Sequence, residues 1–391
     1  MSHKLPHQWS IDHNPLSGIT AGRWWRLLVE NRFDVDIQYV HRAAFVSALS
    51  LFNSACATWE KLRYGKAISQ VALRKDPIFI LGHWRGGTTH LHNMLALDER
   101  LTAPTTFQAV NPSSFLSTLR ILPTVFKPFL PARRPMDEME MGFDMPQEDE
   151  LALSLISGLS PYISLSFPRR AAHYNRFLTF EEASQEEVRQ WKEAFTYFTR
   201  KLGVNETRRV VYKSPGHTAR IKLILEMFPE ARFIHIHRDP YVVFQSCRHY
   251  FQTAAWYANL QRIDTRSVDD AIFKRYQDLY DAYLSQRELI PKGRLHELSY
   301  ESLVDDPLDE MQSLYSKLQI DTFSTVEPRL KRYLDRIATH RVNRHPALNE
   351  EELCRVASEW GKYFEAWGYP LHSSAAEAVE ANDLIGREAL R

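Results

Sequence analysis

The sequence predicts an α/β fold of three layers, in which helices flank a central parallel sheet. Residues 209–228 and 232–251 each have the pattern of a short apolar strand, a turn and a helix. Two such units in succession imply parallel strands joined by right-handed crossovers. A third unit, at 77–97, starts with an apolar strand that ends in glycine. Glycine is scarce, 14 of 391 residues, yet Gly82, Gly86 and Gly87 all fall in the loop of this unit.

Composition and charge exclude several classes of protein. A hydrophobic content of 44% supports a large core and excludes a wholly disordered chain. A net charge of +1 argues against a general nucleic-acid-binding surface but leaves a local basic pocket open. Cys56, Cys247 and Cys354 lie far apart without a CxxC pair, so neither a disulfide framework nor a zinc site is indicated. This cysteine usage fits a reducing cytoplasm, and we expect no metal.

The chain is expected to have three regions. An irregular arm at 1–36 and an amphipathic helix at 39–63 form a region, 1–74, that packs on the core. Residues 75–370 form the main domain, with a proline-rich, irregular insertion at 98–180, and residues 371–391 form a tail. Further helices are predicted at 181–202, 268–290, 302–318 and 350–367, and a further strand at 294–298.

The N-terminal part carries the features closest to membrane signals. Residues 1–15 have no apolar segment of the kind found in secretory signals. Residues 43–59 lack charge but are shorter than the roughly 20 apolar residues of a membrane span. Large apolar residues recur there every three or four positions, which predicts one face of a helix packed on the core, with membrane-surface contact as the alternative. These residues are Phe45, Leu49, Phe52, Cys56, Trp59 and Leu62.

The loop at 82–89 joins a predicted strand to a predicted helix, as phosphate-binding loops do. It departs from the Walker pattern because Gly87, Thr88 and Thr89 stand where that pattern has GK[ST], and the cation, Arg85, comes earlier. The backbone N–H groups of residues 86–89 can still surround an oxyanion. Without a lysine for a γ-phosphate, the loop suits one phosphate that bears another anionic group. The alternative is a glycine turn without function.

Three cations converge on one predicted edge of the sheet. Arg85 lies in the loop, Lys213 and Arg238 end two strands, and Ser246 follows Arg238 by eight residues in the next helix. Ligands of parallel sheets bind beyond the carboxyl ends of the strands. Each cation alone would be read as a surface charge. Together they are costly unless an anion binds among them, so they predict an anion site.

These segments together resemble the sulfotransferases that use 3′-phosphoadenosine-5′-phosphosulfate (PAPS), in particular their bacterial-type branch. The resemblance implies a P-loop-like fold. Residues 77–89 (PIFILGHWRGGTT) are similar to the family's 5′-phosphosulfate loop. Residues 213–215, 228–233 and 238–240, with Ser246, are similar to its 3′-phosphate element, and 300–307 (YESLVDDP) to its Y-x-x-L-x-x-D-P segment. Residues 134–136 and 146–150 are similar to the bacterial-type branch. The resemblance covers 75–370 with gaps, and it departs at Arg85, often Lys in the family, and at Gly86, usually Ser.

The resemblance implies a role for each matched residue. Arg85 would hold the transferring sulfuryl group, and Arg238 with Ser246 would bind the 3′-phosphate. His90 lies beside the loop and is a further candidate for cofactor contact. Arg341, in the basic stretch 339–345, is either a late cofactor contact or part of a solvated loop. The residues expected around the 5′-phosphate are Gly86, Gly87, Thr88 and Thr89.

A hydroxyl acceptor needs a general base. His217 is the first candidate, because it follows Lys213 and a turn much as the family's Lys and His sit at one strand end. A capping contact at a helix start is its alternative. Glu148, in the acidic stretch 147–150, is the second candidate base, and its alternative is a helix start favoured by the helix dipole.

The leading hypothesis is therefore a PAPS-dependent sulfotransferase that acts on a hydroxyl, or less readily an amine, of a small or lipid-like acceptor. The apolar stretch 115–131 and the 12% aromatic content favour an apolar acceptor. An ATP-dependent kinase of related fold is one alternative, against which the missing GK[ST] counts. A non-catalytic module that binds anions or membranes is the other.

Overall fold

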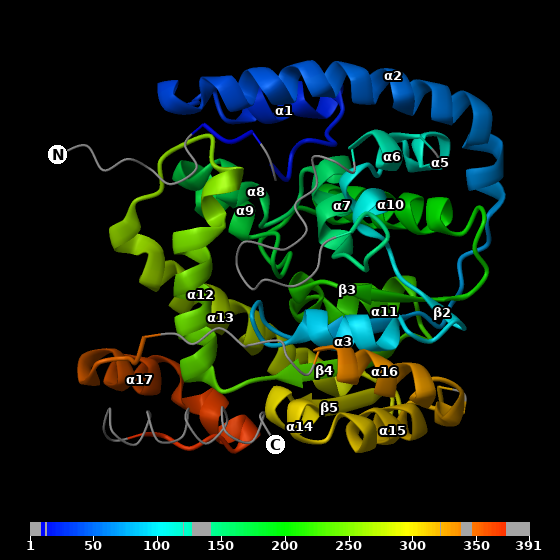
Figure 1. Ribbon diagram of the computed structural model, residues 1–391. Helices are drawn as coiled ribbons and strands as arrows, with labels where there is room; N and C mark the ends of the chain where they lie inside the picture. The colour runs from blue at the N-terminus through cyan, green and yellow to red at the C-terminus, as the bar shows by residue number, and fades with distance from the viewer. Residues whose placement is uncertain are drawn as a thin grey trace. The chain divides into compact units, whose positions relative to one another are not determined.

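The structure, a computed structural model, describes residues 9–11, 14–119, 121–126, 142–320, 322–337 and 346–372. The chain divides into two compact units (Figure 1). Unit 1 comprises Met1–Arg74, Ala103–Arg208 and Phe251–Thr265, and unit 2 comprises Lys75–Thr102, Arg209–Tyr250 and Arg266–Arg391. The expected division into regions 1–74, 75–370 and 371–391 stays a prediction.

Unit 2 contains the parallel sheet that the sequence predicts. Its five strands lie in the order β2-β3-β1-β4-β5, and every pair of neighbours is parallel. The central strand β1 is buried along its whole length, which explains its continuous apolar sequence. The strands are β1 (Ile78–Leu81), β2 (Leu101–Thr102), β3 (Arg209–Lys213), β4 (Arg232–His237) and β5 (Leu295–Ser299). The predicted three-layer α/β fold is confirmed.

Alternating residues of the strands build two different cores on the two faces of this sheet. Ile78, Ile80, Ile234 and Ile236 pack in an aliphatic cluster with residues of helices α3, α14, α15 and α16. Phe79 points to the other face, where its ring contacts an aromatic group from β3, β4 and the segment after α11. The helices of the first face are α3 (Thr88–Leu95), α14 (Tyr300–Asp305), α15 (Pro307–Lys317) and α16 (Glu327–Ile337).

The remaining helices of unit 2 follow the predicted order. Helix α17 (Glu350–Trp367) has the predicted ends, and those of the others are shifted. The helix predicted at 302–318 is two helices, α14 and α15, because Pro307 starts a new helix capped by Asp306. The helix predicted at 218–228 is the turn η4 followed by α11. Other helical elements are η4 (Pro215–Ala219), α11 (Ile221–Met227), α12 (Pro240–Thr253), α13 (Val268–Gln286), η7 (Arg287–Leu289) and η8 (Phe323–Thr325).

Unit 1 is helical, and two expectations for it were wrong. The arm expected to be irregular contains α1 (Ala21–Glu30). The insertion expected to be irregular contains a series of short helices, several of only four or five residues, whose periodicity is too short to detect in a sequence. They are α4 (Thr106–Val110), α5 (Phe115–Thr118), α6 (Leu122–Phe126), α7 (Asp149–Ser157), α8 (Ile163–Ser166) and α9 (Ala171–Asn175). Helix α10 (Gln185–Leu202) starts at a Ser184–Glu187 capping box.

The long helix α2 (Val40–Gln70) turns a different face to the core from the one predicted. Its buried residues are mostly polar, and the residues expected inside include Phe52, Trp59 and Leu62, which are exposed. The polar residues can be buried because other segments of unit 1 satisfy them. Asn53, for example, donates to the carbonyls of Ser17 and Ile19 at 2.8 and 3.0 Å. Among the described residues, no helix is both long enough and apolar enough to cross a bilayer.

Candidate functional site

The loop between β1 and α3 has a backbone that depends on glycine at two positions. Gly82 has φ +145°, and a Cβ there would lie 2.4 Å from the Ile236 carbonyl oxygen. Gly87 has φ +91°, and a Cβ there would lie 2.2 Å from the ring of Tyr300. Arg85 also has a positive φ, +69°, which is rare for a residue with a side chain and often marks a functional turn. Two of the three clustered glycines are thus required by close approach and by φ.

The start of α3 lies at the end of this loop. The Gly86 N–H donates to the His83 carbonyl at 3.0 Å, which closes the turn. Gly87 precedes the helix without a side-chain cap, so the first backbone N–H groups of α3 have no acceptor from a capping residue. Thr88 is buried in this first turn. Residues 87–89 are therefore the part of the predicted anion loop whose N–H groups can face an anion.

Two of the predicted cations and Ser246 are joined by hydrogen bonds. Arg85 Nε donates to Ser246 Oγ at 2.9 Å, and Arg238 Nη1 donates to the Arg85 carbonyl at 3.3 Å. Ser246 is buried, on the second turn of α12. The structure therefore brings together Arg85, Arg238 and Ser246, which are far apart in the sequence.

Tyr300 packs on Arg238 and Glu301 binds the next residue, Asp239, two contacts that the sequence did not assign. The Arg238 guanidinium carbon lies 4.2 Å from the centre of the Tyr300 ring, which also covers Gly87. Glu301 accepts from the Asp239 N–H at 3.2 Å and from the Tyr369 hydroxyl at 2.9 Å. The burial of Asp239 itself, and then the charge of Glu301, raise the pKa of Asp239 to about 6. The sequence analysis had singled out the segment 300–307 by resemblance. Its contact with the loop could not be predicted, because the two segments meet only in the folded chain.

Lys213 is the last residue of β3 and contacts the first turn of α3. Its Nζ donates to Thr89 Oγ1 at 3.3 Å, and its side chain is buried. His92, one turn further along α3, is completely buried, and this burial, then the charge of Lys213, lower its pKa to about 3. His92 is therefore neutral beside the lysine, and Lys213 contributes a positive charge to the start of α3.

His217 lies in η4 and is completely buried. Its ring meets Phe79 edge-on, with 5.3 Å between ring centres. The next residue, Thr218, ties η4 to the loop, because its hydroxyl accepts from the Gly82 N–H at 2.7 Å and donates to the Gly82 carbonyl at 3.2 Å. The predicted base therefore sits on a segment fixed directly to the start of the loop.

Three other histidines lie along the loop and its neighbours. His83 is buried, and burial lowers its pKa to about 3, while its Nδ1 donates to the Trp84 carbonyl at 2.8 Å. The ring of His90 stacks on Tyr333 of α16, with 6.2 Å between ring centres. His249, on α12, has its pKa lowered by burial and then by Arg85, which identifies it as a neighbour of Arg85 that the sequence analysis missed.

The remaining two predicted residues belong to unit 1 and to the residues that the structure does not describe. Glu148 belongs to unit 1, where it precedes α7 and accepts a hydrogen bond from the Tyr162 hydroxyl. Asp149 and Glu150, both buried, occupy the first turn of the same helix. Arg341 lies outside the described residues, as do residues 134–136. Within the described ranges, no group of three or more His, Cys, Asp or Glu side chains is arranged to hold a metal ion.

The fold and this loop define a parallel α/β protein with a glycine-containing loop between the carboxyl end of its central strand and the start of a helix. Residues 77–324, more than half of the chain, match the family described as the Sulfotransferase family. The chain belongs to this family. The resemblance noted in the sequence is confirmed.

Two relatives and two solved structures are bacterial proteins of the same kind. The omega-hydroxy-beta-dihydromenaquinone-9 sulfotransferases Stf3 of Mycobacterium bovis and Mycobacterium tuberculosis are each 36% identical over 357 residues, which is 91% of this chain and 91% of theirs. The sulfotransferase STF9 of Mycobacterium avium has a TM-score of 0.64 at 20% identity, over 90% of this chain and 97% of its own. STF1 of M. tuberculosis has a TM-score of 0.61 at 16% identity, over 90% and 94%. At these identities the two structures support the fold alone.

Proposed function

We propose that this protein transfers a sulfuryl group from PAPS to a hydroxyl of a lipid-like acceptor. The observation that carries the proposal is the hydrogen-bonded group of Arg85, Ser246 and Arg238 beside the start of α3. It offers two guanidinium groups and a helix N-terminus at the carboxyl edge of the sheet. A donor with separate 5′ and 3′ anionic groups needs two such anion sites.

The residues present fit this donor. Residues 87–89 would hold the 5′-phosphate through their N–H groups, with Lys213 adding charge through Thr89. Arg238 and Ser246 would bind the 3′-phosphate, and the buried Ser246 hydroxyl fits a fixed, partly dehydrated oxyanion. Gly86 contributes by backbone only, and His90, stacked on Tyr333, is a weaker candidate for nucleotide contact. Arg341 remains a proposed contact outside the described residues.

The chemistry that these residues would perform is an in-line displacement. The acceptor oxygen forms a bond to sulfur while the bond from sulfur to the bridging phosphate oxygen breaks, and the nucleotide leaves as adenosine 3′,5′-bisphosphate. His217 would take the hydroxyl proton, and Glu148 is the second candidate for this step. Arg85 and Lys213 would stabilise the charge that develops on the sulfuryl and leaving oxygens.

The acceptor class is proposed from the Stf3 relatives. Their name describes a sulfotransferase of a hydroxylated menaquinone, a quinone with a long isoprenoid chain. Because identity with them is 36% over nine-tenths of the chain, we propose a hydroxylated, lipid-like acceptor here also. We further propose that 75–370 is the sulfotransferase domain and that 98–180 contributes to the acceptor side.

Calorimetric titration of the full chain with nucleotides tests the donor assignment. We expect adenosine 3′,5′-bisphosphate to bind at least about tenfold more tightly than ATP with Mg²⁺, since the loop lacks a lysine for a γ-phosphate. Ser246→Ala should reduce this preference, whereas Ser324→Ala, at an exposed serine of η8, should leave it unchanged. Tighter binding of ATP with Mg²⁺ would favour a kinase and overturn the proposal.

A further inference from the structure

Helix α2 exposes an apolar face that is continuous over most of its length. Between Val40 and Leu62, nine exposed residues are uncharged. Eight of them are apolar, and the ninth is Thr58. Leu51, Trp59 and Leu62 are 67%, 60% and 79% exposed. The apolar face is defined by Val40, Ala44, Ala48, Leu51, Phe52, Ala55, Trp59 and Leu62. At 1.5 Å per residue it extends for about 33 Å.

The opposite face of α2 is polar and is held inside unit 1. Glu60 forms a buried ion pair with Lys201 of α10, and it also accepts from the Ser117 N–H at 2.9 Å. Arg42 donates to the Ser10 carbonyl at 2.9 Å and to the Asn259 carbonyl at 3.1 Å. Such contacts fix the rotation of the helix about its axis. The apolar residues are therefore held outward by specific bonds, which is the reverse of an ordinary surface helix.

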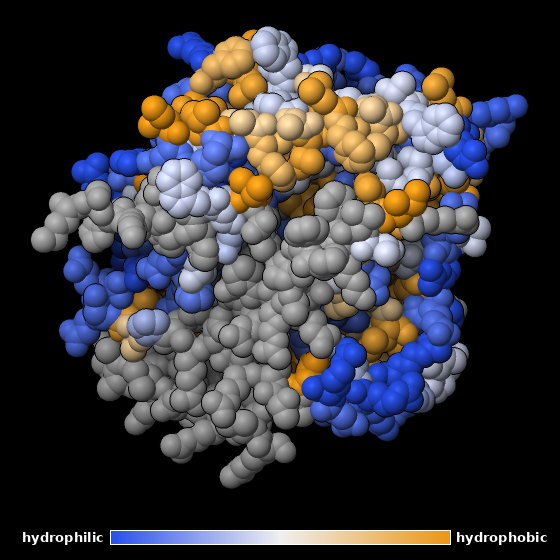
Figure 2. All heavy atoms as spheres, turned by 45° about the horizontal axis from the view of Figure 1, so that its top comes forward, coloured by the Kyte–Doolittle hydropathy of each residue, from blue (hydrophilic) through white to orange (hydrophobic). Residues whose placement is uncertain are grey.

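Neighbouring segments extend the same hydrophobic surface. Figure 2 shows apolar residues gathered over the helices that lie at the top of Figure 1, α1 and α2. In the connection between these helices, Phe33 has φ +55° and packs edge-on against Trp25, with 5.3 Å between ring centres, and both are exposed. Ile37 is 91% exposed. A surface of this size and hydrophobicity marks a contact site in a globular protein.

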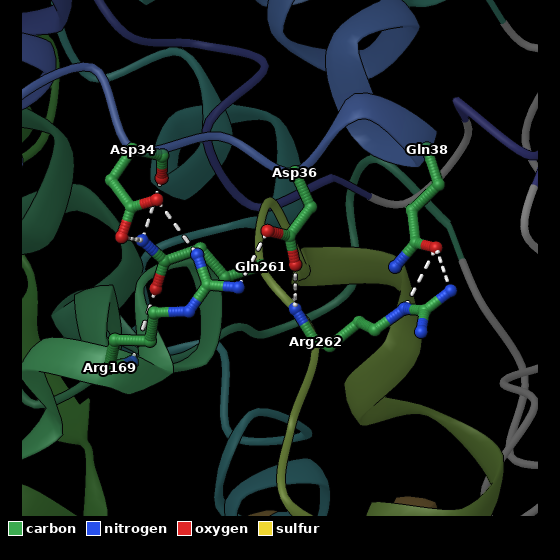
Figure 3. A network of polar contacts seen from close by, with 6 residues as sticks. All are labelled: Asp34, Asp36, Gln38, Arg169, Gln261 and Arg262. Atoms are coloured by element: carbon green, nitrogen blue, oxygen red, sulfur yellow. Dashed lines mark hydrogen bonds and ion pairs between the residues drawn. The ribbon is translucent and has the colours of Figure 1, made fainter.

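A network of polar contacts holds this connection in a fixed shape (Figure 3). Arg169 bonds Asp34 and Asp36 at 2.8 and 2.6 Å. The Arg262 N–H donates to Asp36 at 2.7 Å, and its guanidinium donates to Gln38 Oε1. The two acidic groups of the connection are thus engaged with a cation within unit 1. The exposed side chains of Phe33 and Ile37 therefore belong to a loop whose conformation is fixed by these polar contacts.

The charges on α2 indicate what the apolar face contacts. The exposed charged residues of α2 are all cations, Lys61, Arg63 and Lys66, and they lie in the last turn of the apolar face and just beyond it. Its single carboxylate, Glu60, is buried against Lys201. An apolar stripe next to exposed lysine and arginine is the pattern of a helix that lies in a membrane interface and contacts anionic head groups.

We propose that the apolar face of α2 docks the protein on the surface of a membrane that contains anionic phospholipid. The apolar residues enter the boundary between head groups and acyl chains, and Lys61, Arg63 and Lys66 contact the phosphates. The helix lies parallel to the surface and does not cross it. A second copy of this chain is the competing occupant. The exposed cations disfavour it, because in an isologous contact of this face α2 offers them no exposed carboxylate as a partner. The proposal stands on α2 and does not depend on the reaction.

Vesicle sedimentation of the full chain tests this proposal. Vesicles of equal parts phosphatidylglycerol and phosphatidylcholine should pellet the protein, and vesicles of phosphatidylcholine alone should pellet it more weakly. Trp59→Asp and Leu62→Glu should each reduce binding at least about tenfold, because each places a charge in the apolar boundary. The control is Leu289→Glu, which changes an exposed leucine of η7 in unit 2. This variant should bind the vesicles as the unchanged protein does.

The cations provide an independent variant. Replacing Lys61, Arg63 and Lys66 by Gln should reduce binding to the anionic vesicles by about fivefold per cation, with little effect on phosphatidylcholine vesicles. Gel filtration and thermal unfolding of each variant show whether its fold and oligomeric state are kept. The proposal is overturned if the unchanged protein does not pellet with anionic vesicles, or if Trp59→Asp only dissociates a dimer. Because sedimentation reads no sulfate transfer, such a failure would leave the proposed reaction untouched.

Discussion

Arg85 occupies a left-handed backbone conformation between two segments that fix it. Its carbonyl accepts from Arg238 and its guanidinium donates to Ser246, so one residue links the loop to β4 and α12. The sequence could predict that these three residues lie at one edge, because each follows a predicted strand or loop. It could not predict that Arg85 itself is the link, since that depends on its φ and on the register of β1 with β4.

At Arg238, the change Arg238→Gln should remove selectivity for the 3′-phosphate. The loss of a charge-assisted bond costs about 1.5–3 kcal/mol, which is a loss of roughly tenfold or more in affinity. Titration calorimetry should show weaker binding of adenosine 3′,5′-bisphosphate with little change for adenosine 5′-phosphate. Equal weakening of both nucleotides would show that Arg238 acts on the loop and not on the 3′-phosphate.

At Gly87, the change Gly87→Ala should destabilise the protein more than the strain of a positive φ alone. The added Cβ would lie 2.2 Å from the Tyr300 ring and displace it from Arg238. Gly293→Ala is the matched control, because Gly293 has φ +80° and nothing within 4 Å of the added Cβ. The control should cost about 1–2 kcal/mol in urea unfolding, and Gly87→Ala should cost clearly more. Equal costs would mean that Tyr300 moves without penalty.

At the scale of elements, α2 illustrates where a periodic pattern misleads. Its apolar residues recur every three or four positions, and a helix in a soluble protein normally buries such a face. Here the polar face is buried instead, because Asn53, Arg42 and Glu60 find partners in other parts of unit 1. Those partners are distant in sequence, so periodicity alone could not decide which face is inside. The strands β1, β3 and β4 were predictable, since a buried parallel strand is apolar on both faces, whereas the two-residue β2 lies in a segment that was expected to be irregular.

The buried ion pair under α2 gives a prediction at this scale. Lys201 and Glu60 are both completely buried, and burial, partly offset by Glu60, lowers the pKa of Lys201 to about 8. Lys201→Met should destabilise unit 1 by about 3–5 kcal/mol, because it leaves the Glu60 carboxylate buried without its partner. Denaturant unfolding measures this cost. The double change Lys201→Met with Glu60→Leu should recover much of the stability. A double variant as unstable as the single one would show that the pair itself, and not the unpaired charge, matters.

At the scale of the whole molecule, the buried histidines of unit 2 make the fold sensitive to acid. Burial lowers the pKa of His83, His92 and His237 to about 3, so below pH 6.5 the unfolded chain binds protons that the folded chain does not. Asp239, with its pKa raised to about 6, acts in the opposite direction between about pH 4 and 6. These three histidines and this aspartate alone leave a net uptake of about two protons on unfolding near pH 5, and His235, whose pKa is also lowered by burial, adds in the same direction.

Stability should therefore fall as the pH is lowered from about 6.5 towards 4, with a slope of about 3 kcal/mol per pH unit. Urea unfolding at a series of pH values measures this slope. His92→Gln should reduce this slope by the contribution of about one proton, since His92 is one of the histidines that take up a proton on unfolding. A stability that is constant between pH 7 and 5 would contradict the predicted protonation states.

The overall assignment depends on a small number of segments. The parallel arrangement of the sheet, the loop at 82–87 and the cations at 85, 213 and 238 were predictable from the apolar runs and the turns that follow them, whereas the strand order was not. Tyr300, Glu301 and Tyr369 were not, since their contacts with Gly87 and Asp239 come from parts of the chain that meet only in the fold.

Transfer of labelled sulfate from PAPS to a hydroxylated isoprenoid quinone tests the central claim most directly. The unchanged protein should form the sulfated lipid. Arg85→Ala should reduce kcat by about a hundredfold to a thousandfold while still binding adenosine 3′,5′-bisphosphate, as expected when a group that stabilises developing charge is removed. Absence of transfer by the unchanged protein, or full activity of Arg85→Ala, would contradict the account.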